Sequence, residues 1–440
     1  MGESDRVVAL TDPDAEGVDP ERRRVLQERR LRGVVDRLLA AGGLQAERLR
    51  GAGVSAGAEV GLTDLPKLPM VTKRDLWDHY PNGLRAVDDD QIVCIHGSSG
   101  TGGRPTLVPY TAQDLDVWGQ VMARALGGAG ATRRSLVHNA YGYGLFTGGL
   151  GVHHGSIRLG ATVLPISGGM TDRQVRLIAD LKPDILTCTP SYAIHLGEAL
   201  GAAGVRSSFS AGIFGAEPWT DSMRGQIERL LEVRALDIYG LSEIIGPGVA
   251  CESLDSGGLL NVAEDHFYVE ALDSDGVPVA DGTPGELVFT TLTKTGMPLL
   301  RYRSGDVAAL AAPIAGSPRT LRRMSKVLGR MDDMLVIRGV NVYPTEIESV
   351  LLSDSRVGPH YLLVEDRRVA ARPELRIAVE ALSGDGDAVR RELEHALRER
   401  LAVGCVVRVL PTGSVPRTET GKAKRLVRWS SGEPPIAGLL

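Results

Sequence analysis

Cysteine is scarce in this chain, and so are long apolar runs and aromatic side chains. The four cysteines are far apart and form no Cys-x-x-Cys pair, so the sequence indicates neither a disulfide framework nor a thiolate metal site. They are Cys94, Cys188, Cys251 and Cys405. No stretch holds about 18 consecutive apolar residues, so no segment is expected to span a bilayer. Phe, Trp and Tyr together make up only 4% of the residues.

An excess of positive charge is also lacking. Lys and Arg number 50 against 55 for Asp and Glu, a formal net charge of −5. This balance gives no general attraction to nucleic acid or to an anionic membrane, and we expect neither as a partner. The amino-terminal residues are charged early and show no apolar leader, so we expect a cytoplasmic protein.

The chain does have the length and composition of a multidomain globular protein. It has 440 residues, of which 43% are hydrophobic and 24% charged, which excludes disorder for the bulk of the chain. Gly is abundant at 54 residues, and such an excess is typical of turns and of backbone that approaches a ligand closely. Residues 1–35 are rich in charge and predict a solvated helix.

From about residue 90 onward, strand-like and helix-like segments alternate. Apolar β-prone runs are separated by helix candidates, which predicts a parallel sheet covered by helices. The expected strands are 91–96, 106–110, 136–140, 161–166, 184–189 and 210–214, and the expected helices are 171–181, 191–203 and 220–233. Thr171 and Thr220 have the side chains preferred at a helix N-cap.

After Tyr239 the pattern changes twice. The runs 266–272, 285–292 and 299–302 predict antiparallel strands. From about residue 330 we expect a small α/β unit, with strands 334–338, 360–364, 375–381 and 406–410, a helix opened by Pro344, and an amphipathic helix 385–401. The expected division is a large domain 1–331 and a small domain 332–440.

The strongest local motif is a glycine- and hydroxyl-rich turn between two strands, Ser98-Ser99-Gly100-Thr101-Gly102-Gly103-Arg104-Pro105-Thr106. Its backbone N–H groups could surround phosphate oxygens, and Arg104 could add positive charge. It is not a GxxxxGK[ST] loop, because no Lys-Ser or Lys-Thr follows at that spacing. On its own, such a turn is more often an ordinary hairpin.

Further motifs follow this turn in order along the chain. They are Gly215-Ala216-Glu217-Pro218, Asp237-Ile238-Tyr239-Gly240-Leu241-Ser242-Glu243, Tyr302-Arg303-Ser304-Gly305-Asp306, Gly329-Arg330-Met331-Asp332-Asp333 with Arg338-Gly339, and Pro416-Arg417-Thr418-Glu419-Thr420-Gly421-Lys422. This ordered set resembles the adenylate-forming superfamily of acyl-CoA synthetases, adenylation domains and luciferases. Within it, the segments 141–149, 213–219, 237–250, 286–302 and 334–344 resemble phenylacetate–CoA ligases.

The resemblance implies a nucleotide site. Its ATP-binding residues would be Ser98, Ser99, Gly100, Thr101, Gly102, Gly103, Gly215, Ala216, Glu217, Pro218, Asp237, Ile238, Tyr239, Gly240, Ser242, Asp306 and Arg330. The loop would hold the β- and γ-phosphates, Tyr239 would stack on adenine, and Asp306 would accept hydrogen bonds from the ribose hydroxyls. Glu243 would bind Mg²⁺, which prefers carboxylate and phosphate oxygens.

The resemblance also implies a catalytic lysine, a hinge and an acid pocket. Lys422 would bridge the acid's carboxylate and the α-phosphate, offsetting the repulsion between two anions. Asp332 would be the hinge about which a small mobile lid domain rotates. The acid-binding residues would be Tyr141, Phe146, Ala216, Gly240, Ile245 and Pro247, a set that suits a flat aryl ring.

The sequence departs from the family pattern at three points. Gly102 replaces a usual Thr and Arg104 a usual Lys, and Cys251 has no Cys or His partners for the zinc that some relatives carry, so no zinc is expected. The adjacent His153 and His154 would point to different sides and have separate roles.

We therefore expect an ATP-dependent aryl-acid CoA ligase that uses Mg²⁺ and coenzyme A and releases AMP and pyrophosphate. One alternative is a stand-alone enzyme that loads the acid onto a carrier-protein phosphopantetheine, and another is a nucleotide-binding regulator without activity. Analogy with relatives suggests a homodimer.

Overall fold

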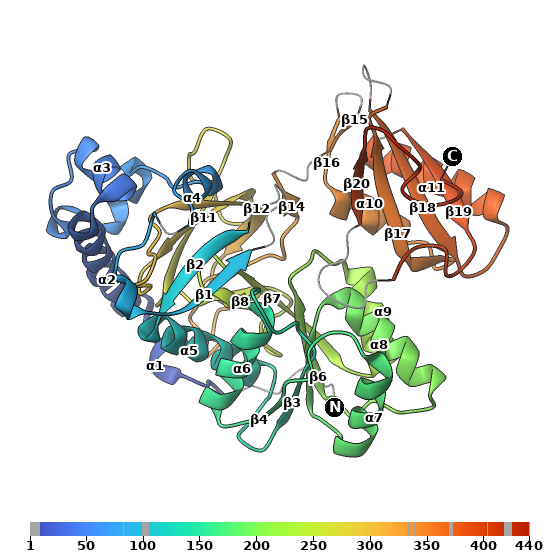
Figure 1. Ribbon diagram of the computed structural model, residues 1–440, viewed down its shortest axis with the longest axis horizontal. Helices are drawn as coiled ribbons and strands as arrows, with labels where there is room; N and C mark the ends of the chain where they lie inside the picture. The colour runs from blue at the N-terminus through green and yellow to red at the C-terminus, as the bar shows by residue number, and fades with distance from the viewer. Residues whose placement is uncertain are drawn as a thin grey trace.

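The computed structural model describes residues 9–81, 83–98, 105–331, 335–337, 340–368, 373–402, 404–417 and 425–439. Figure 1 shows a large α/β body and a smaller carboxyl-terminal part beside helices α8 and α9. Within the described residues, no helix is both long and apolar enough to cross a bilayer.

The chain begins with helices that pack along one side of the body. They are α1 (Pro13–Glu16), α2 (Pro20–Ala41), α3 (Gly43–Gly51) and α4 (Lys73–Asp78), with short 3₁₀ turns at Gly57–Glu59, Leu62–Lys67 and Asp89–Gln91. The expectation of a solvated helix was wrong for α2. Leu31 and Val35 are fully buried, and Arg23 is buried in an ion pair with Glu264 at 3.3 Å.

A hairpin and two helices lead into the main sheet. Strands β1 (Ile92–Ser98) and β2 (Thr106–Thr111) pair antiparallel. Helix α5 (Ala112–Gly128) follows at once, capped by Thr111, which accepts from the Asp114 backbone N–H. Helix α6 (Gly148–Leu159) packs against α5, and the two lie on the opposite side of the sheet from α8 and α9 (Figure 1).

Five strands of the main sheet are parallel. Their order is β7-β6-β5-β3-β4, with bounds β3 (Leu136–Asn139), β4 (Thr162–Leu164), β5 (Ile185–Cys188), β6 (Ala211–Gly215) and β7 (Arg234–Leu241). The intervening helices are α7 (Thr171–Leu181), α8 (Pro190–Ala202) and α9 (Asp221–Leu231). Because β6 and β7 are parallel neighbours, their carboxyl ends lie at the same sheet edge, where open α/β sheets bind ligands.

The same sheet continues with antiparallel strands beyond β7. The order is β10-β11-β12-β13-β9-β8-β7, and β14 pairs with β12. The bounds are β8 (Gly246–Cys251), β9 (Leu260–Val262), β10 (Phe267–Leu272), β11 (Pro284–Thr291), β12 (Tyr302–Ala311), β13 (Arg323–Met324) and β14 (Gly329–Arg330). One large hydrophobic cluster joins α5 to this sheet and includes Trp118, Val249 and Phe289.

The carboxyl-terminal part is a four-stranded sheet with two helices. Its order is β19-β18-β17-β20, with bounds β17 (Val357–Asp366), β18 (Glu374–Ala381), β19 (Cys405–Leu410) and β20 (Leu426–Trp429). Helices α10 (Pro344–Leu351) and α11 (Gly386–Leu401) pack on it, and β15 (Leu335–Ile337) pairs with β16 (Val340–Val342). Ser222 on α9 donates to the Leu352 carbonyl at 2.7 Å, so this part contacts the body.

The expected fold class is confirmed: parallel strands with helices, a β-rich continuation, and a carboxyl-terminal α+β unit. The mobility of that unit and the division at residues 331/332 stay predictions, because residues 332–334 lie outside the described part.

Some local expectations were wrong. Met170, not Thr171, is the N-cap of α7. The strand expected at 299–302 begins only at Tyr302, because Arg301 has a φ of +49°, which breaks an extended run.

Candidate active site

Glu243 lies in the turn between β7 and β8, facing the start of the glycine-rich turn. Its carboxylate Oε1 accepts a hydrogen bond of 3.1 Å from the hydroxyl of Ser98, the last residue of β1. Glu243 is buried to 3% exposure. The structure therefore brings together two residues 145 positions apart that the sequence assigned to one site.

Ser242 ties this turn to the hairpin. Its hydroxyl donates to the Gly97 carbonyl at 3.3 Å and lies 3.3 Å from the Thr147 hydroxyl. Its own carbonyl accepts from the Tyr110 hydroxyl at 2.9 Å. Ser242 thus anchors the turn through its contacts with the end of β1, with β2 and with the loop before α6.

A second polar group links β7, β12 and β14. The Tyr239 hydroxyl donates to Asp306 Oδ2 at 2.7 Å, and Arg330 Nη1 lies 3.7 Å from Asp306 Oδ1. Burial raises the pKa of Tyr239 well above its usual value, and the Asp306 charge raises it further. One face of the Tyr239 ring stacks on Phe289 at 5.8 Å between centroids, so adenine stacking is left to the other face and stays a prediction.

The segment Gly215 to Pro218 follows the end of β6. A Cβ at Gly215 would lie 2.3 Å from the Ile238 carbonyl oxygen, so only glycine fits beside β7. Ala216 has a φ of +70°, an unusual backbone state for a residue with a side chain. Glu217 is buried and accepts a 2.7 Å hydrogen bond from the Ser191 N–H in the first turn of α8.

Asp237 and Ile238 are both buried within β7. The Asp237 backbone N–H donates to Glu252 at 2.6 Å. Burial raises the pKa of Asp237 to about 7, and the nearby Glu252 charge acts in the same direction. Asp237 is therefore a buried carboxyl group in the middle of β7, with a pKa raised to about 7 by burial.

The residues predicted to bind the acid have unequal exposure. Tyr141 and Ile245 are buried, while Phe146 in the loop before α6 is 54% exposed. Burial raises the pKa of Tyr141 well above its usual value, and the charges of Asp237 and Glu217 add to this. Gly240 pairs with Pro247 across β7 and β8. Tyr141 is thus close enough to Glu217 for that charge to affect its pKa, whereas the Phe146 side chain is exposed to solvent.

Several predicted residues lie outside the described part of the chain. They are Ser99, Gly100, Thr101, Gly102, Gly103, Asp332 and Lys422. Arg425, three positions after Lys422, is described. Its Nη1 lies 3.3 Å from the Met223 sulfur on α9 and 3.0 Å from Glu348 Oε2 on α10. The start of β20 is therefore held against the body near Glu217, whose charge reaches Arg425.

His153 and His154 have separate surroundings, as expected. His153 Nδ1 lies 3.2 Å from the Tyr143 hydroxyl, whereas the His154 ring lies 5.8 Å from the Trp118 ring. The two histidines thus contact different residues, Tyr143 and Trp118.

Sequence reasoning missed Lys294. This side chain is 1% exposed and its Nζ donates to the Glu243 carbonyl at 2.9 Å. Burial lowers the pKa of Lys294 to about 8, while the charges of Asp114 and Glu243 act in the opposite direction. Besides the Glu243 motif, the capping box of Thr111 and Asp114 is a sequence signal near this cluster.

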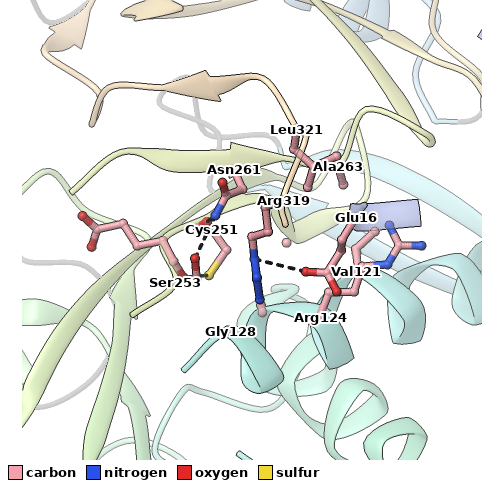
Figure 2. Close-up of a pocket in the computed structure, with 13 residues that line it drawn as sticks. Glu16, Val121, Arg124, Gly128, Cys251, Ser253, Asn261, Ala263, Arg319 and Leu321 are labelled. Carbon is pink, nitrogen blue, oxygen red and sulfur yellow. Dashed lines mark hydrogen bonds and ion pairs between the residues drawn. The ribbon is translucent and has the colours of Figure 1, made fainter. Parts of the chain in front are cut away.

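Cys251 lines a small cavity elsewhere in the body. The cavity has a volume of about 30 Å³, enough for a water molecule, and Figure 2 shows the Arg319 side chain extending through it beside Glu16. The Cys251 thiol donates to the Glu252 carbonyl at 3.2 Å. Among the described residues, no three His, Cys, Asp or Glu side chains are grouped to hold a metal ion.

The residues around Glu243 do suit Mg²⁺. A single buried carboxylate beside a serine hydroxyl supplies hard oxygen ligands, and Mg²⁺ in nucleotide sites is commonly held by one or two carboxylates plus phosphate oxygens. The absence of a three-residue cluster in the described part is compatible with such a site.

Comparison with known proteins gives matches over nearly the whole chain. The family model described as AMP-binding enzyme matches residues 7–293, and the AMP-binding enzyme C-terminal domain matches residues 339–428. A phenylacetate-coenzyme A ligase of Thermus thermophilus is 46% identical, covering 94% of this chain and 98% of the relative. The Escherichia coli phenylacetate-coenzyme A ligase is 44% identical, covering 91% and 93%.

Solved structures of CoA ligases also superpose on nearly the whole chain. A 2-hydroxyisobutyryl-CoA ligase in the postadenylation state is 27% identical and superposes with a TM-score of 0.87, covering 94% of this chain and 91% of that one. The same ligase in the thioesterification state superposes with a TM-score of 0.71, covering 95% and 92%. With two family models matched in order and relatives above 40% identity over most of their length, the chain belongs to the AMP-binding enzyme family, as its ordered motifs predicted.

Proposed function

We propose that the protein is an ATP-dependent aryl-acid CoA ligase that acts through an aryl-adenylate. The main structural support for this proposal is the hydrogen bond between Ser98, the first residue of the glycine-rich turn, and the Glu243 carboxylate. Similarity to phenylacetate-coenzyme A ligases at 42–46% identity supports the substrate class.

In the first step, an oxygen of the acid's carboxylate attacks the α-phosphorus of ATP. The bond from that phosphorus to the bridging oxygen breaks, and pyrophosphate leaves. Ser98 and the glycine-rich turn would bind the β- and γ-phosphates, Glu243 would hold Mg²⁺, and Asp306 would bind the ribose hydroxyls. Bound Mg²⁺ supplies neutralisation of phosphate charge.

Lys422 would place its ammonium group between the two anions of this step. Two negatively charged reactants repel one another, and a cation between them lowers that cost and stabilises charge on the pentavalent phosphorus. Arg330, 3.7 Å from Asp306, adds positive charge beside the ribose site.

The acid would bind with its ring against Tyr141, Ala216, Gly240, Ile245 and Pro247. Phe146 is exposed here, and we propose that it packs on the bound ring. Phenylacetate and substituted benzoates are the acids that we propose.

In the second step, the thiol of coenzyme A attacks the acyl carbon and AMP leaves. We propose that residues 332–440 form a lid domain that rotates about Asp332, removing Lys422 and bringing residues 338–341 toward the CoA arm. We propose free CoA as the acceptor; a carrier-protein phosphopantetheine would use the same residues. A cytoplasmic homodimer is part of this proposal by analogy.

We expect Asp332→Pro to slow thioester formation more than adenylate formation, because proline fixes one backbone dihedral at the hinge. The two half-reactions would be measured separately, by pyrophosphate exchange and by thioester formation from supplied acyl-adenylate. Equal slowing of both would contradict a hinge at this position.

A pyrophosphate-exchange screen over phenylacetate and substituted benzoates tests the proposal. We expect exchange with at least one aryl acid, followed by thioester formation with free CoA. Thioester formed only on a carrier protein would favour the loading enzyme. No exchange with any aryl acid would contradict the proposal and favour a nucleotide-binding regulator.

A further inference from the structure

Lys294 is a fully buried lysine for which the reaction described above has no use. It lies just after β11 and is 1% exposed, whereas Lys326 in the same body has a side chain that is 33% exposed. Taking an ammonium out of water is costly unless it is paired and hydrogen-bonded. Its partners therefore indicate what the fold gains from it.

Those partners belong to the turn that contains Glu243 and to Tyr110 on β2, which is hydrogen-bonded to that turn. The Lys294 Nζ donates to the Glu243 main-chain carbonyl at 2.9 Å and lies 4.8 Å from the centre of the Tyr110 ring. The Tyr110 hydroxyl donates to the preceding carbonyl, that of Ser242, at 2.9 Å. Two buried side chains thus hold two consecutive carbonyls of the turn.

The backbone that carries Lys294 is itself held by a buried carboxylate. Asp114 Oδ1 accepts from the Thr295 N–H at 2.7 Å and from its hydroxyl at 3.1 Å. Its Oδ2 accepts from the Gly296 N–H at 2.9 Å and the Thr111 N–H at 3.0 Å. Asp114 is fully buried in the first turn of α5, so Lys294 extends from a rigid base.

On the other side of the turn, the Glu243 carboxylate meets Ser98 at the start of the glycine-rich turn. The contacts therefore run from Asp114 through the Lys294 segment to the Glu243 peptide and on to Ser98. The side-chain direction of a residue depends on its backbone, so fixing the Glu243 peptide limits where its carboxylate can point.

We propose that Lys294 is a positioning residue for the nucleotide site: it holds the Glu243 peptide so that the carboxylate is preset to bind the metal ion of Mg·ATP. The proposal rests on the role proposed above for Glu243. It assigns Lys294 no contact with substrate, and its effect passes through the Glu243 main chain.

The test measures binding of ATP to the full-length protein by titration calorimetry, without any acid, in Mg²⁺ and again in EDTA. We expect Lys294→Met to weaken binding about tenfold in Mg²⁺ and to leave it unchanged in EDTA, because only the metal-dependent part needs the preset carboxylate. Lys294→Arg, which keeps a donor and the charge, should recover most of the loss.

Two further variants separate positioning from loss of stability. Tyr110→Phe removes only the hydroxyl that holds the Ser242 carbonyl, and we expect about a threefold loss in Mg²⁺ alone, even if Lys294→Met folds poorly. Arg124→Met removes another buried cation, one paired with Asp265 at 2.8 Å, and should lower the melting temperature with no change in ATP affinity.

Equal losses in Mg²⁺ and EDTA, or a lower melting temperature with unchanged Mg·ATP affinity in both Lys294→Met and Tyr110→Phe, would overturn the inference. Failure of the wild-type protein to bind ATP at all would instead contradict the proposed function.

Discussion

Glycine stands where the strands of the candidate site lie too close for a side chain. A Cβ at Gly240 would fall 1.9 Å from the Gly246 carbonyl oxygen on β8. The neighbouring atoms belong to the backbone of Gly246 and Pro247, so they cannot move aside as a flexible side chain could. Glycine at position 240 therefore allows β7 and β8 to lie close together on either side of the turn that presents Glu243.

We expect Gly240→Ala to lower the free energy of unfolding by about 1–3 kcal/mol, the usual cost of overpacking, and to weaken ATP binding. Urea unfolding and titration calorimetry would measure the two effects. Gly201→Ala on α8 is the matched control, since its Cβ meets nothing within 4 Å, and it should stabilise the helix slightly. Unchanged stability in Gly240→Ala would show that β7 and β8 separate easily.

Asp237 predicts a pH dependence of stability. Its folded pKa of about 7 lies above the unfolded value of 3.8. Between about pH 4 and pH 7 the folded state keeps a proton that the unfolded state has released, so the stability contributed by Asp237 is lost as pH rises through this window.

Asp237→Asn removes that titration. We expect the wild-type protein to lose stability relative to this variant between pH 4.5 and pH 8, by about 3 kcal/mol. Urea unfolding of both proteins at the two pH values would measure this. A difference between them that is the same at both pH values would mean that Asp237 does not titrate with a raised pKa.

At this scale the sequence predicted the residues with motif signals but not those that support them. Ser98, Glu243, Tyr239 and Asp306 were assigned to one site, and the structure pairs them as Ser98 with Glu243 and Tyr239 with Asp306. Lys294 was not predicted, because the role that we propose for it depends on burial against a turn 51 positions away in the sequence, and burial is a tertiary property.

At the scale of elements, the alternating strands and helices between residues 161 and 233 were predicted closely, since each has its own apolar period and turn signals. Helices α5 and α6 were missed. Glycine weakens helix propensity, and α6 contains Gly151 and Gly155, yet a Cβ at those positions would lie 2.6 Å from Trp118 and 2.4 Å from Met122. Close packing of the two helices thus overrides local propensity.

Strand β20 was also missed, although it begins just after Arg425, which joins it to the body. The Arg425 guanidinium pairs with Glu348 and lies beside the Met223 sulfur on α9. We expect Arg425→Gln to slow adenylate formation about tenfold and thioester formation less, because the contact with α9 belongs to the domain arrangement seen here. Pyrophosphate exchange and thioester formation from supplied adenylate would measure this.

Arg428→Gln on the same strand is the control, since Arg428 pairs with Glu365 within the carboxyl-terminal sheet. It should leave both half-reactions unchanged. Equal losses of both half-reactions in Arg425→Gln would point to unfolding of the small unit instead of loss of docking.

For the whole molecule, the arrangement of the two parts is closer to one state of a related ligase than to another. The TM-score to the postadenylation structure is 0.87, and to the thioesterification structure of the same ligase it is 0.71. The order of the motifs predicted the family. The sequence has no local signal for the arrangement, because α9 meets the small unit through residues such as Ser222 and Met223 that lie outside every motif.

The most direct test of the account is the effect of Lys422→Ala on the two half-reactions. We expect pyrophosphate exchange to fall at least a hundredfold, because the cation that offsets the two anions is gone. Thioester formation from supplied aryl-adenylate should remain within a few-fold of the wild-type rate. Loss of both to the same extent, or of neither, would contradict a lysine that acts only in forming the adenylate.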